Sequence, residues 1–350
     1  MNQSEVFCFS AFIVFVAIML AVDLGIFNKK DHIIKSREAL VWSTVWVSLA
    51  LLFYGFLYKY AEKIHGIETI EELKSYVVLY GQKVKINPID FEQSLRSYRS
   101  IFSLEFLSGY VIELSLSVDN IFIIILIFAA FKVQKQLYHR VLFWGIIGAV
   151  VFRCIFIFAG SFLINQFFWI LYIFAGFLIF TGIKMLINRD EVETVDSEKH
   201  VVVKFASHFF KVHPKFYGNK FFIKKDQQSY ITPLFLVLLM IEFSDIVFAV
   251  DSIPAVFAVT KDPYIVFFSN IFAILGLRSM FFLLINVVHK FHFFKYGLAI
   301  LLIFIGLKMI LAEKLEAIGF TITHSLIVIL SILLGSIILS FLFPEKGKTI

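Results

Sequence analysis

The sequence has few of the residues that soluble folds, disulfide scaffolds and thiolate metal sites require. Only 17% of its 350 residues are charged, against about 25% in an ordinary soluble domain. Its two cysteines, Cys8 and Cys154, stand alone in apolar stretches, so they indicate neither a disulfide framework nor a thiolate metal site. The basic residues behind the net charge of +6 lie between apolar blocks and form no basic, aromatic-rich face, so no nucleic-acid partner is predicted.

Apolar residues, by contrast, make up 60% of the chain and include 45 phenylalanines. They are grouped in blocks of about twenty residues, the length of helix that crosses the roughly 30 Å core of a bilayer. This pattern predicts an all-α polytopic membrane protein whose constant partner is the lipid bilayer. About nine transmembrane helices are expected, at residues 6–27, 39–58, 104–131, 140–162, 167–187, 231–259, 264–288, 296–312 and 322–343.

Lysine and arginine gather in alternate linkers. They are frequent after the first, third, fifth and seventh predicted helices, whereas linkers 163–166, 260–263 and 313–321 carry one such residue or none. By the positive-inside rule the N-terminus is expected outside the cell and the C-terminus in the cytoplasm. On this topology 61–103 is a polar extracytoplasmic segment and 189–229 is a cytoplasmic loop.

Two segments of three predicted helices, 104–188 and 230–312, resemble each other. In each, two carboxylates six residues apart are followed by an arginine in the next helix and by Gly-x-Lys-Met in the third. The matched residues, 132, 125 or 124 positions apart, are Glu113 with Asp245, Asp119 with Asp251, Arg153 with Arg278, and Lys184 with Lys308. Because each unit has three spans, the second must enter from the opposite side, as in secondary transporters with inverted repeats. Two leading helices (1–60) and a last helix with its tail (313–350) flank the repeats.

Ionisable side chains inside the predicted spans are the strongest functional signal. An ionised group at the bilayer centre costs at least about 2.5–3.5 kcal/mol on insertion scales, so such residues face protein or water. Two mid-span arginines, Arg153 and Arg278, are expected to pair with acids. The candidate metal ligands are Glu113, Asp119, Asn120, Glu242, Asp245 and Asp251, with Asp23, Ser117, Ser244 and Ser252 as further candidates.

Carboxylate, amide and hydroxyl oxygens together form a hard-oxygen site, which suits Mn²⁺, Mg²⁺ or Ca²⁺. Carboxylates that release a metal ion can take up protons, so exchange for H⁺ is chemically natural. Residues six apart point about 240° apart around a helix, so one common pocket would require both acidic helices to bend or unwind. Pro254 supplies such a break beside Asp251, whereas no proline lies near Asp119.

Both acidic segments resemble signatures of the TerC/Alx family. They read Glu113-Leu-Ser-Leu-Ser-Val-Asp119-Asn-Ile-Phe and Ile241-Glu-Phe-Ser-Asp-Ile-Val-Phe-Ala-Val-Asp-Ser-Ile-Pro-Ala-Val-Phe-Ala-Val-Thr260, and supporting matches extend from about residue 20 to 310. The resemblance implies a bacterial inner-membrane protein tied to manganese efflux, to tellurium resistance and to alkaline conditions, with kinship to the LysE exporter superfamily. It also implies that the family's acidic signature falls on Glu113, Asp119, Glu242, Asp245 and Asp251. For the redox label that some members carry, this sequence contains neither a paired-cysteine motif nor a cofactor fingerprint.

Three interpretations remain open at this point. The first is a Mn²⁺ exporter that works by alternating access, is not an enzyme and needs no resident cofactor. The second is a non-transporting membrane stress or assembly factor, in which the acids and arginines form structural ion pairs and the 189–229 segment docks partners. The third is an intramembrane enzyme that uses paired carboxylates, although no nucleophile motif supports it. The oligomeric state is not indicated by the sequence.

Overall fold

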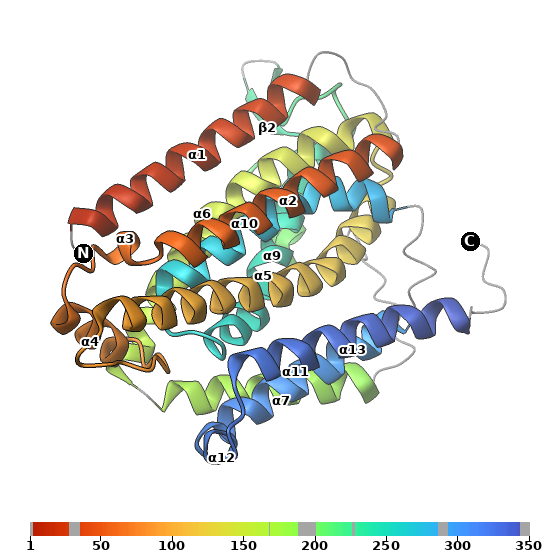
Figure 1. Ribbon diagram of the computed structural model, residues 1–350. Helices are drawn as coiled ribbons and strands as arrows, with labels where there is room; N and C mark the ends of the chain where they lie inside the picture. The colour runs from red at the N-terminus through yellow and green to blue at the C-terminus, as the bar shows by residue number, and fades with distance from the viewer. Residues whose placement is uncertain are drawn as a thin grey trace.

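The computed structural model describes residues 3–27, 36–167, 169–187, 201–225, 228–285 and 293–343. Within these ranges the chain is predominantly helical, which confirms the predicted all-α membrane class. The long helices run side by side in an elongated bundle (Figure 1). They are α1 (Gln3–Phe27), α2 (Ser36–Tyr60), α5 (Phe91–Ala130), α6 (Tyr138–Gln166), α7 (Ile170–Ile187), α9 (Pro233–Phe257), α10 (Pro263–Leu284), α11 (Phe294–Ile310) and α13 (Ile322–Leu342).

Short elements occupy both ends of the bundle. A small antiparallel hairpin, which the sequence did not predict, pairs β1 (Phe222–Lys225) with β2 (Gln228–Ile231) directly before α9. The remaining short helices are α3 (Glu62–His65), α4 (Ile70–Leu79), η1 (Lys135–Leu137), α8 (Val201–Phe209) and α12 (Ala312–Ala317).

Eight helices in the described ranges are long and apolar enough to cross a membrane. They are α1, α2, α5, α6, α7, α9, α10 and α13. Helix α11 occupies the position of the remaining predicted span but has 17 residues, slightly fewer than the roughly 20 that a perpendicular crossing needs. The predicted total of nine therefore stays a prediction, with eight helices that meet the criterion.

Helix α5 begins at Phe91, well before the predicted span at 104–131. The side chain of Asp90 caps its first turn by accepting a hydrogen bond of 2.9 Å from the Gln93 N–H. Arg96 and Arg99 in the early turns made this stretch too polar to be recognised as a span, although Leu95 and other residues of the same turns are buried. Part of the predicted polar segment 61–103 is thus the start of a long helix.

Helix α10 lies at the centre of the bundle, where it packs against α2, α5 and α6. Almost all of its side chains are buried, and many of them are phenylalanines that contact rings from α1 and α2. Phe12 and Phe268 have ring centroids 4.6 Å apart, and Phe53 and Phe272 are 5.0 Å apart. The high phenylalanine content therefore fills the core as well as covering the lipid-facing surface.

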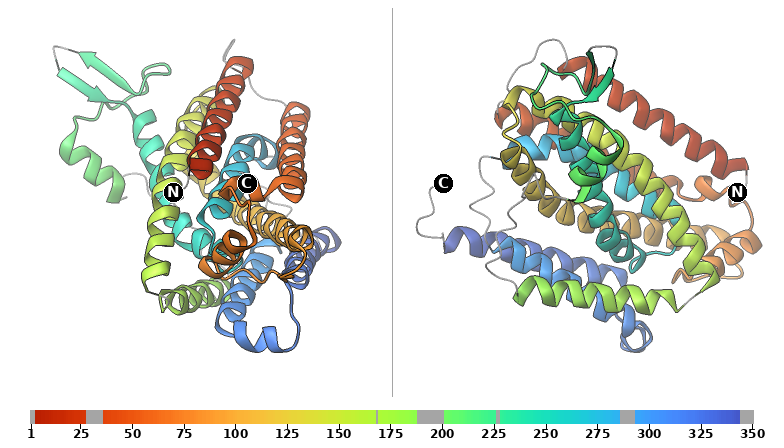
Figure 2. Two further views of the ribbon diagram at one scale, coloured as in Figure 1. Left: turned by 60° about the vertical axis from the view of Figure 1, so that its left-hand side comes forward. Right: turned by 180° about the vertical axis from the view of Figure 1, so that it is seen from behind.

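The third helices of the two predicted repeats, α7 and α11, cross in close and reciprocal contact. A methyl group added at Gly182 would lie 2.7 Å from the carbonyl oxygen of Ala299, and one at Gly306 would lie 2.7 Å from that of Ala175. Each residue of one contact lies 124 positions from its counterpart in the other contact, and the two helices cross in antiparallel directions. This reciprocity is what a two-fold relation between inverted units predicts. Helices α7, α11 and α13 form a separate layer beside the main bundle (Figures 1 and 2).

Candidate functional site

A small cavity of about 50 Å³ lies between the layer formed by α7 and α11 and the main bundle. This volume accommodates an ion with a few water molecules. The cavity is lined by Glu113, Leu116, Ser117, Asp119 and Asn120 from α5, Arg153 from α6, Thr181 and Met185 from α7, Phe248, Asp251 and Ser252 from α9, and Leu298 and Leu302 from α11. It therefore joins both acidic segments that the sequence singled out.

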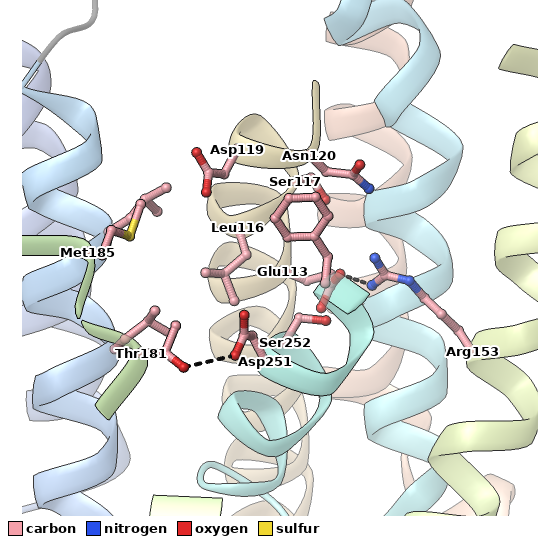
Figure 3. Close-up of a pocket in the computed structure, with 13 residues that line it drawn as sticks. Glu113, Leu116, Ser117, Asp119, Asn120, Arg153, Thr181, Met185, Asp251 and Ser252 are labelled. Carbon is pink, nitrogen blue, oxygen red and sulfur yellow. Dashed lines mark hydrogen bonds and ion pairs between the residues drawn. The ribbon is translucent and has the colours of Figure 1, made fainter. Parts of the chain in front are cut away.

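Helix α5 contributes to the cavity through one helical face. Glu113, Leu116, Ser117 and Asn120 follow the i, i+3, i+4, i+7 spacing of neighbours on a helix. Asp119 joins the lining from the edge of this face, with its carboxylate directed toward α7 (Figure 3). Helix α5 is continuous from Phe91 to Ala130. The break near Asp119 on which a common pocket was expected to depend is therefore absent from this helix.

Helix α9 contributes Asp251 and Ser252 from its last turns. The Asp251 carboxylate accepts a hydrogen bond of 3.3 Å from the Thr181 hydroxyl of α7 (Figure 3). Pro254 lies within the helix, which continues to Phe257 without interruption. Pro254 thus does not unwind α9, and the acids of α5 and α9 meet because both helices line one cavity.

Arg153 is the centre of the buried charge network. Its guanidinium is almost fully buried and forms ion pairs with Glu113 and, at 3.2 Å, with Asp245. It also donates a hydrogen bond of 2.7 Å to the Asn270 side-chain oxygen. The prediction that this arginine pairs with acids is consistent with these contacts, and its two partners are the acids that correspond in the two repeats.

The charge of the cavity suits a divalent cation. Its lining includes three carboxylates, Glu113, Asp119 and Asp251, and one guanidinium, Arg153, which leaves a net charge of −2 when all are ionised. Figure 3 shows Arg153 on one side of the cavity, with Asp119 and Asp251 on the side that faces α7. Two of the three carboxylates in the lining, Asp119 and Asp251, therefore lie between α5, α9 and α7.

Several oxygen atoms around the cavity are buried without a protein hydrogen-bond partner. They include the hydroxyls of Ser117 and Ser252 and the side-chain oxygen of Asn120, whose amide nitrogen donates 2.9 Å to Asp245. A buried polar atom without a partner is costly, so such atoms mark places where water or a ligand is bound. Neutral oxygens beside carboxylates are the donors that hard cations prefer.

Other predicted residues lie outside the cavity lining. Asp245 is held next to it by Arg153 and Asn120. Glu242 lies against Gly148 of α6, Ser244 is half-buried on α9, and Arg278 is buried in α10.

The described side chains do not form a ready-made metal centre. In the described ranges no group of three or more His, Cys, Asp or Glu side chains is gathered closely enough to hold a metal ion. The side chain of Asp23, another predicted ligand, lies outside the described residues. A cation in the cavity would need neutral oxygens and water as well as carboxylates.

Thr181 and Met185 are lining residues that the sequence did not identify. They belong to the Thr-Gly-Ile-Lys-Met segment, in which only Lys184 drew attention because of its charge. Their contact with the cavity comes from the close packing of α7 against the rest of the site. Helix spacing places both on one face of α7, four residues apart, but does not show what that face contacts.

A second polar cluster was also missed, and it joins α1, α3, α4 and the start of α10. His65 is fully buried, with Nδ1 2.9 Å from the Glu5 carboxylate and Nε2 2.8 Å from that of Asp262. Tyr76 and Tyr264 each donate a hydrogen bond of 3.2 Å to Glu5. Burial alone lowers the pKa of His65, but the charges and hydrogen bonds of Asp262 and Glu5 outweigh it and raise the pKa to about 9.

The fold and the cavity define a multi-pass membrane protein with a carboxylate-lined site buried between its helices. The chain belongs to the integral membrane protein TerC family, whose profile matches residues 98–348. It is 43% identical over 304 residues to an uncharacterized membrane protein of Myxococcus xanthus, covering 87% of this chain and 83% of that protein. It is 42% identical over 303 residues to an Escherichia coli (strain K12) protein named as a candidate membrane-bound redox modulator, Alx, covering 86% and 85%. No solved structure gives a significant match.

Proposed function

We propose that this protein exports a hard divalent cation, Mn²⁺, across the bacterial inner membrane through the cavity between α5, α7 and α9. The observation that carries this proposal is the composition of the cavity. Three carboxylates and one arginine give it a net charge of −2, and the buried oxygens of Ser117, Asn120 and Ser252 lack protein partners. Together these groups can replace part of the hydration shell of a divalent ion.

Met185 supports the choice of Mn²⁺ among the hard cations. It is the one sulfur-containing residue in the cavity lining and comes from the same helix as Thr181. Mg²⁺ and Ca²⁺ bind almost only oxygen, whereas a thioether is a soft donor that transition metals accept more readily. A site with mostly oxygen donors and one thioether therefore favours Mn²⁺ over the alkaline-earth ions.

The proposed transport cycle uses the two three-helix units. Inverted units place a site at their interface, where either side of the membrane can be opened in turn. The reciprocal crossing of α7 and α11 supports such a relation. In the cycle that we propose, H⁺ replaces the metal on the carboxylates during the return step. The protein then needs no resident cofactor and is not an enzyme.

The second candidate is a non-transporting membrane factor, and the Arg153 network is what favours it. An arginine that pairs with Glu113 and Asp245 would also serve a purely structural role. The redox activity in the name of the Escherichia coli relative would need a thiol pair or a cofactor, whereas Cys8 and Cys154 are both free thiols. Redox chemistry through an internal disulfide is therefore not our proposal.

Reconstitution tests the proposed function directly. Liposomes that contain only this protein and an internal Mn²⁺ indicator should show Mn²⁺ flux that protein-free liposomes lack, with a smaller response to Mg²⁺ and Ca²⁺. A pH gradient should drive Mn²⁺ accumulation if protons are exchanged. Folded, correctly inserted protein that moves none of the three cations would contradict transport and favour the non-transporting factor.

A further inference from the structure

The segment between α7 and α9 carries a feature that the proposed transport site does not use. Helix α8 and the β1–β2 hairpin project sideways from the bundle, which is clear when the molecule is turned (Figure 2, left). Helix α8 is anchored by Ala206, which is buried against Leu236 of α9 and Ile231 of β2. A lateral projection of this kind would lie above lipid, beyond the edge of the helix bundle.

The hairpin is fixed at the level where α9 begins. The N–H of Thr232, the residue before α9, donates a hydrogen bond of 2.9 Å to the Phe221 carbonyl. Its hydroxyl donates one of 2.7 Å to the Lys220 carbonyl. Because α9 enters the membrane at this point, these bonds hold the projecting segment close to the membrane surface.

Helix α8 presents three different faces. One face holds Ala206 against the bundle. The second carries Phe205 and Phe209, one turn apart with ring centroids 4.9 Å apart, and these rings are 66% and 63% exposed. The third, next to the rings and opposite Ala206, carries Lys204 and His208. A short anchored helix with an exposed aromatic edge beside a basic edge has the character of an interfacial helix.

Basic residues dominate the charge of α8 and the hairpin. Residues 201–231 contain six lysines and a single acid, Asp226. Clusters of four to eight basic residues next to a transmembrane helix attract the anionic headgroups of the adjacent leaflet. Tyr217 and Phe222 add two more exposed aromatic rings to the same segment, and aromatic rings favour the boundary between headgroups and acyl chains.

We propose that α8 and the β1–β2 hairpin form a lipid-binding surface that holds anionic headgroups of the adjacent leaflet. Phe205 and Phe209 enter the boundary of the acyl chains, and the lysines contact the phosphates. The position of the segment beside the bundle, at the start of α9, favours lipid as the occupant over a soluble protein. The proposal does not depend on what the central cavity transports.

Depth-dependent quenching tests this surface. The full-length protein, with Cys8 and Cys154 replaced by alanine, is labelled with a fluorophore at Phe209→Cys and placed in nanodiscs. The nanodiscs contain either phosphatidylcholine alone or a mixture rich in phosphatidylglycerol, with spin-labelled lipid as the quencher. A label at Ile89→Cys, a position 96% exposed in the loop before α5, reports the background.

We expect the Phe209 label to be quenched at least about threefold more in the anionic nanodiscs than in the neutral ones. Replacing Lys204, Lys211 and Lys215 together by glutamine should abolish this difference. The matched replacement of three exposed lysines elsewhere, Lys74, Lys83 and Lys85, should leave it unchanged.

Two results would overturn the proposal. A label that stays unquenched in both lipid mixtures would show that the segment stands in water and is open to a protein partner. Quenching that is equal in both mixtures, and insensitive to the triple lysine replacement, would show that headgroup charge is not recognised.

Discussion

Arg153 divides the buried carboxylates into two groups. It pairs with Glu113 and Asp245 and so compensates charge on its side of the cavity. Asp119 and Asp251 lie toward α7, on the opposite side (Figure 3). Because breaking a buried ion pair is costly, the first group is suited to hold the helices together, and the second supplies the carboxylates that the proposed transport would use.

Removing Arg153 should therefore destabilise the fold. In Arg153→Ala, Glu113 and Asp245 lose their cation, and breaking a buried pair typically costs about 3–5 kcal/mol. Thermal unfolding in detergent should show a clearly lower midpoint, together with a lower folded yield. The control is Arg140→Ala, whose guanidinium lies over the Phe221 ring at 5.3 Å and should contribute about 0.5–1 kcal/mol. Equal stability of the two variants would contradict a structural role for the Arg153 network.

Neutralising Asp119 or Asp251 should lower Mn²⁺ flux without lowering the stability of the fold. Asp119→Asn and Asp251→Asn each remove one charged ligand, so Mn²⁺ flux should fall by about tenfold or more, the equivalent of at least about 1.4 kcal/mol in binding. Stability should not decrease, because asparagine keeps the size and a carbonyl oxygen while lowering the cost of desolvation. Glu313→Gln, which changes an exposed acid on α12, is the matched control for loss of one charge. Wild-type flux in both variants would show that neither aspartate is needed to bind the transported ion.

At the scale of the helices, apolar length and periodicity predicted most of the structure. The last helix was expected at 322–343 and is found at Ile322–Leu342. The long amphipathic start of α5 was not predicted, because its burial depends on packing against other segments, which local composition does not reveal. The hairpin before α9 escaped for a similar reason: its four-residue strands resemble loop sequence until they pair.

The candidate site, like the fold, was predicted from the sequence only in part. The sequence located the acidic helices, because charges inside apolar spans are rare and costly. It could not show that α7 completes the cavity, nor that His65 bridges Glu5 and Asp262, which lie 60 and 197 positions away. Such contacts depend on how distant helices meet in three dimensions.

The His65 cluster predicts a specific dependence of stability on pH. Both ring nitrogens face carboxylates, so the protonated ring can donate to Glu5 and Asp262 at once. Because the folded pKa, about 9, lies above the usual value of 6.5, the stabilisation is complete below about pH 6.5. It is lost as the pH rises through about 9, and amounts to on the order of 3 kcal/mol. Tyr76, Tyr80 and Tyr264 also face the ring.

Thermal unfolding measured between pH 6 and 10 checks this dependence. The midpoint of the wild-type protein should fall across the range, whereas His65→Gln should be less stable at low pH and nearly independent of pH. His324→Gln, which changes the exposed capping histidine of α13, should behave like the wild type. A His65→Gln profile parallel to the wild type would show that this ring does not control the effect.

At the scale of the whole molecule, the two layers suggest where movement would occur. Helices α7, α11 and α13 form one layer (Figure 1). The cavity is lined by residues of α7 and α11 from this layer and of α5, α6 and α9 from the bundle. The close glycine contacts of Gly182 and Gly306 make the α7–α11 pair a tightly packed unit. A shift of this layer against the bundle would change access to the cavity without breaking the Arg153 network.

The orientation of the molecule in the membrane is predicted from the distribution of basic residues, and the prediction is directly testable. Helix α6 ends at Gln166, and α8 lies beside the β1–β2 hairpin; the end of α6 and the hairpin are at opposite ends of the bundle (Figures 1 and 2). The lysine-rich 201–225 segment is expected in the cytoplasm by the positive-inside rule.

Gln166→Cys and Ser207→Cys, each in a background without Cys8 and Cys154, should therefore differ in labelling. A membrane-impermeant thiol reagent added to intact cells should modify only Gln166→Cys, and Ser207→Cys should react once the membrane is permeabilised. Labelling of Ser207→Cys in intact cells would reverse the proposed orientation, and with it the direction of export.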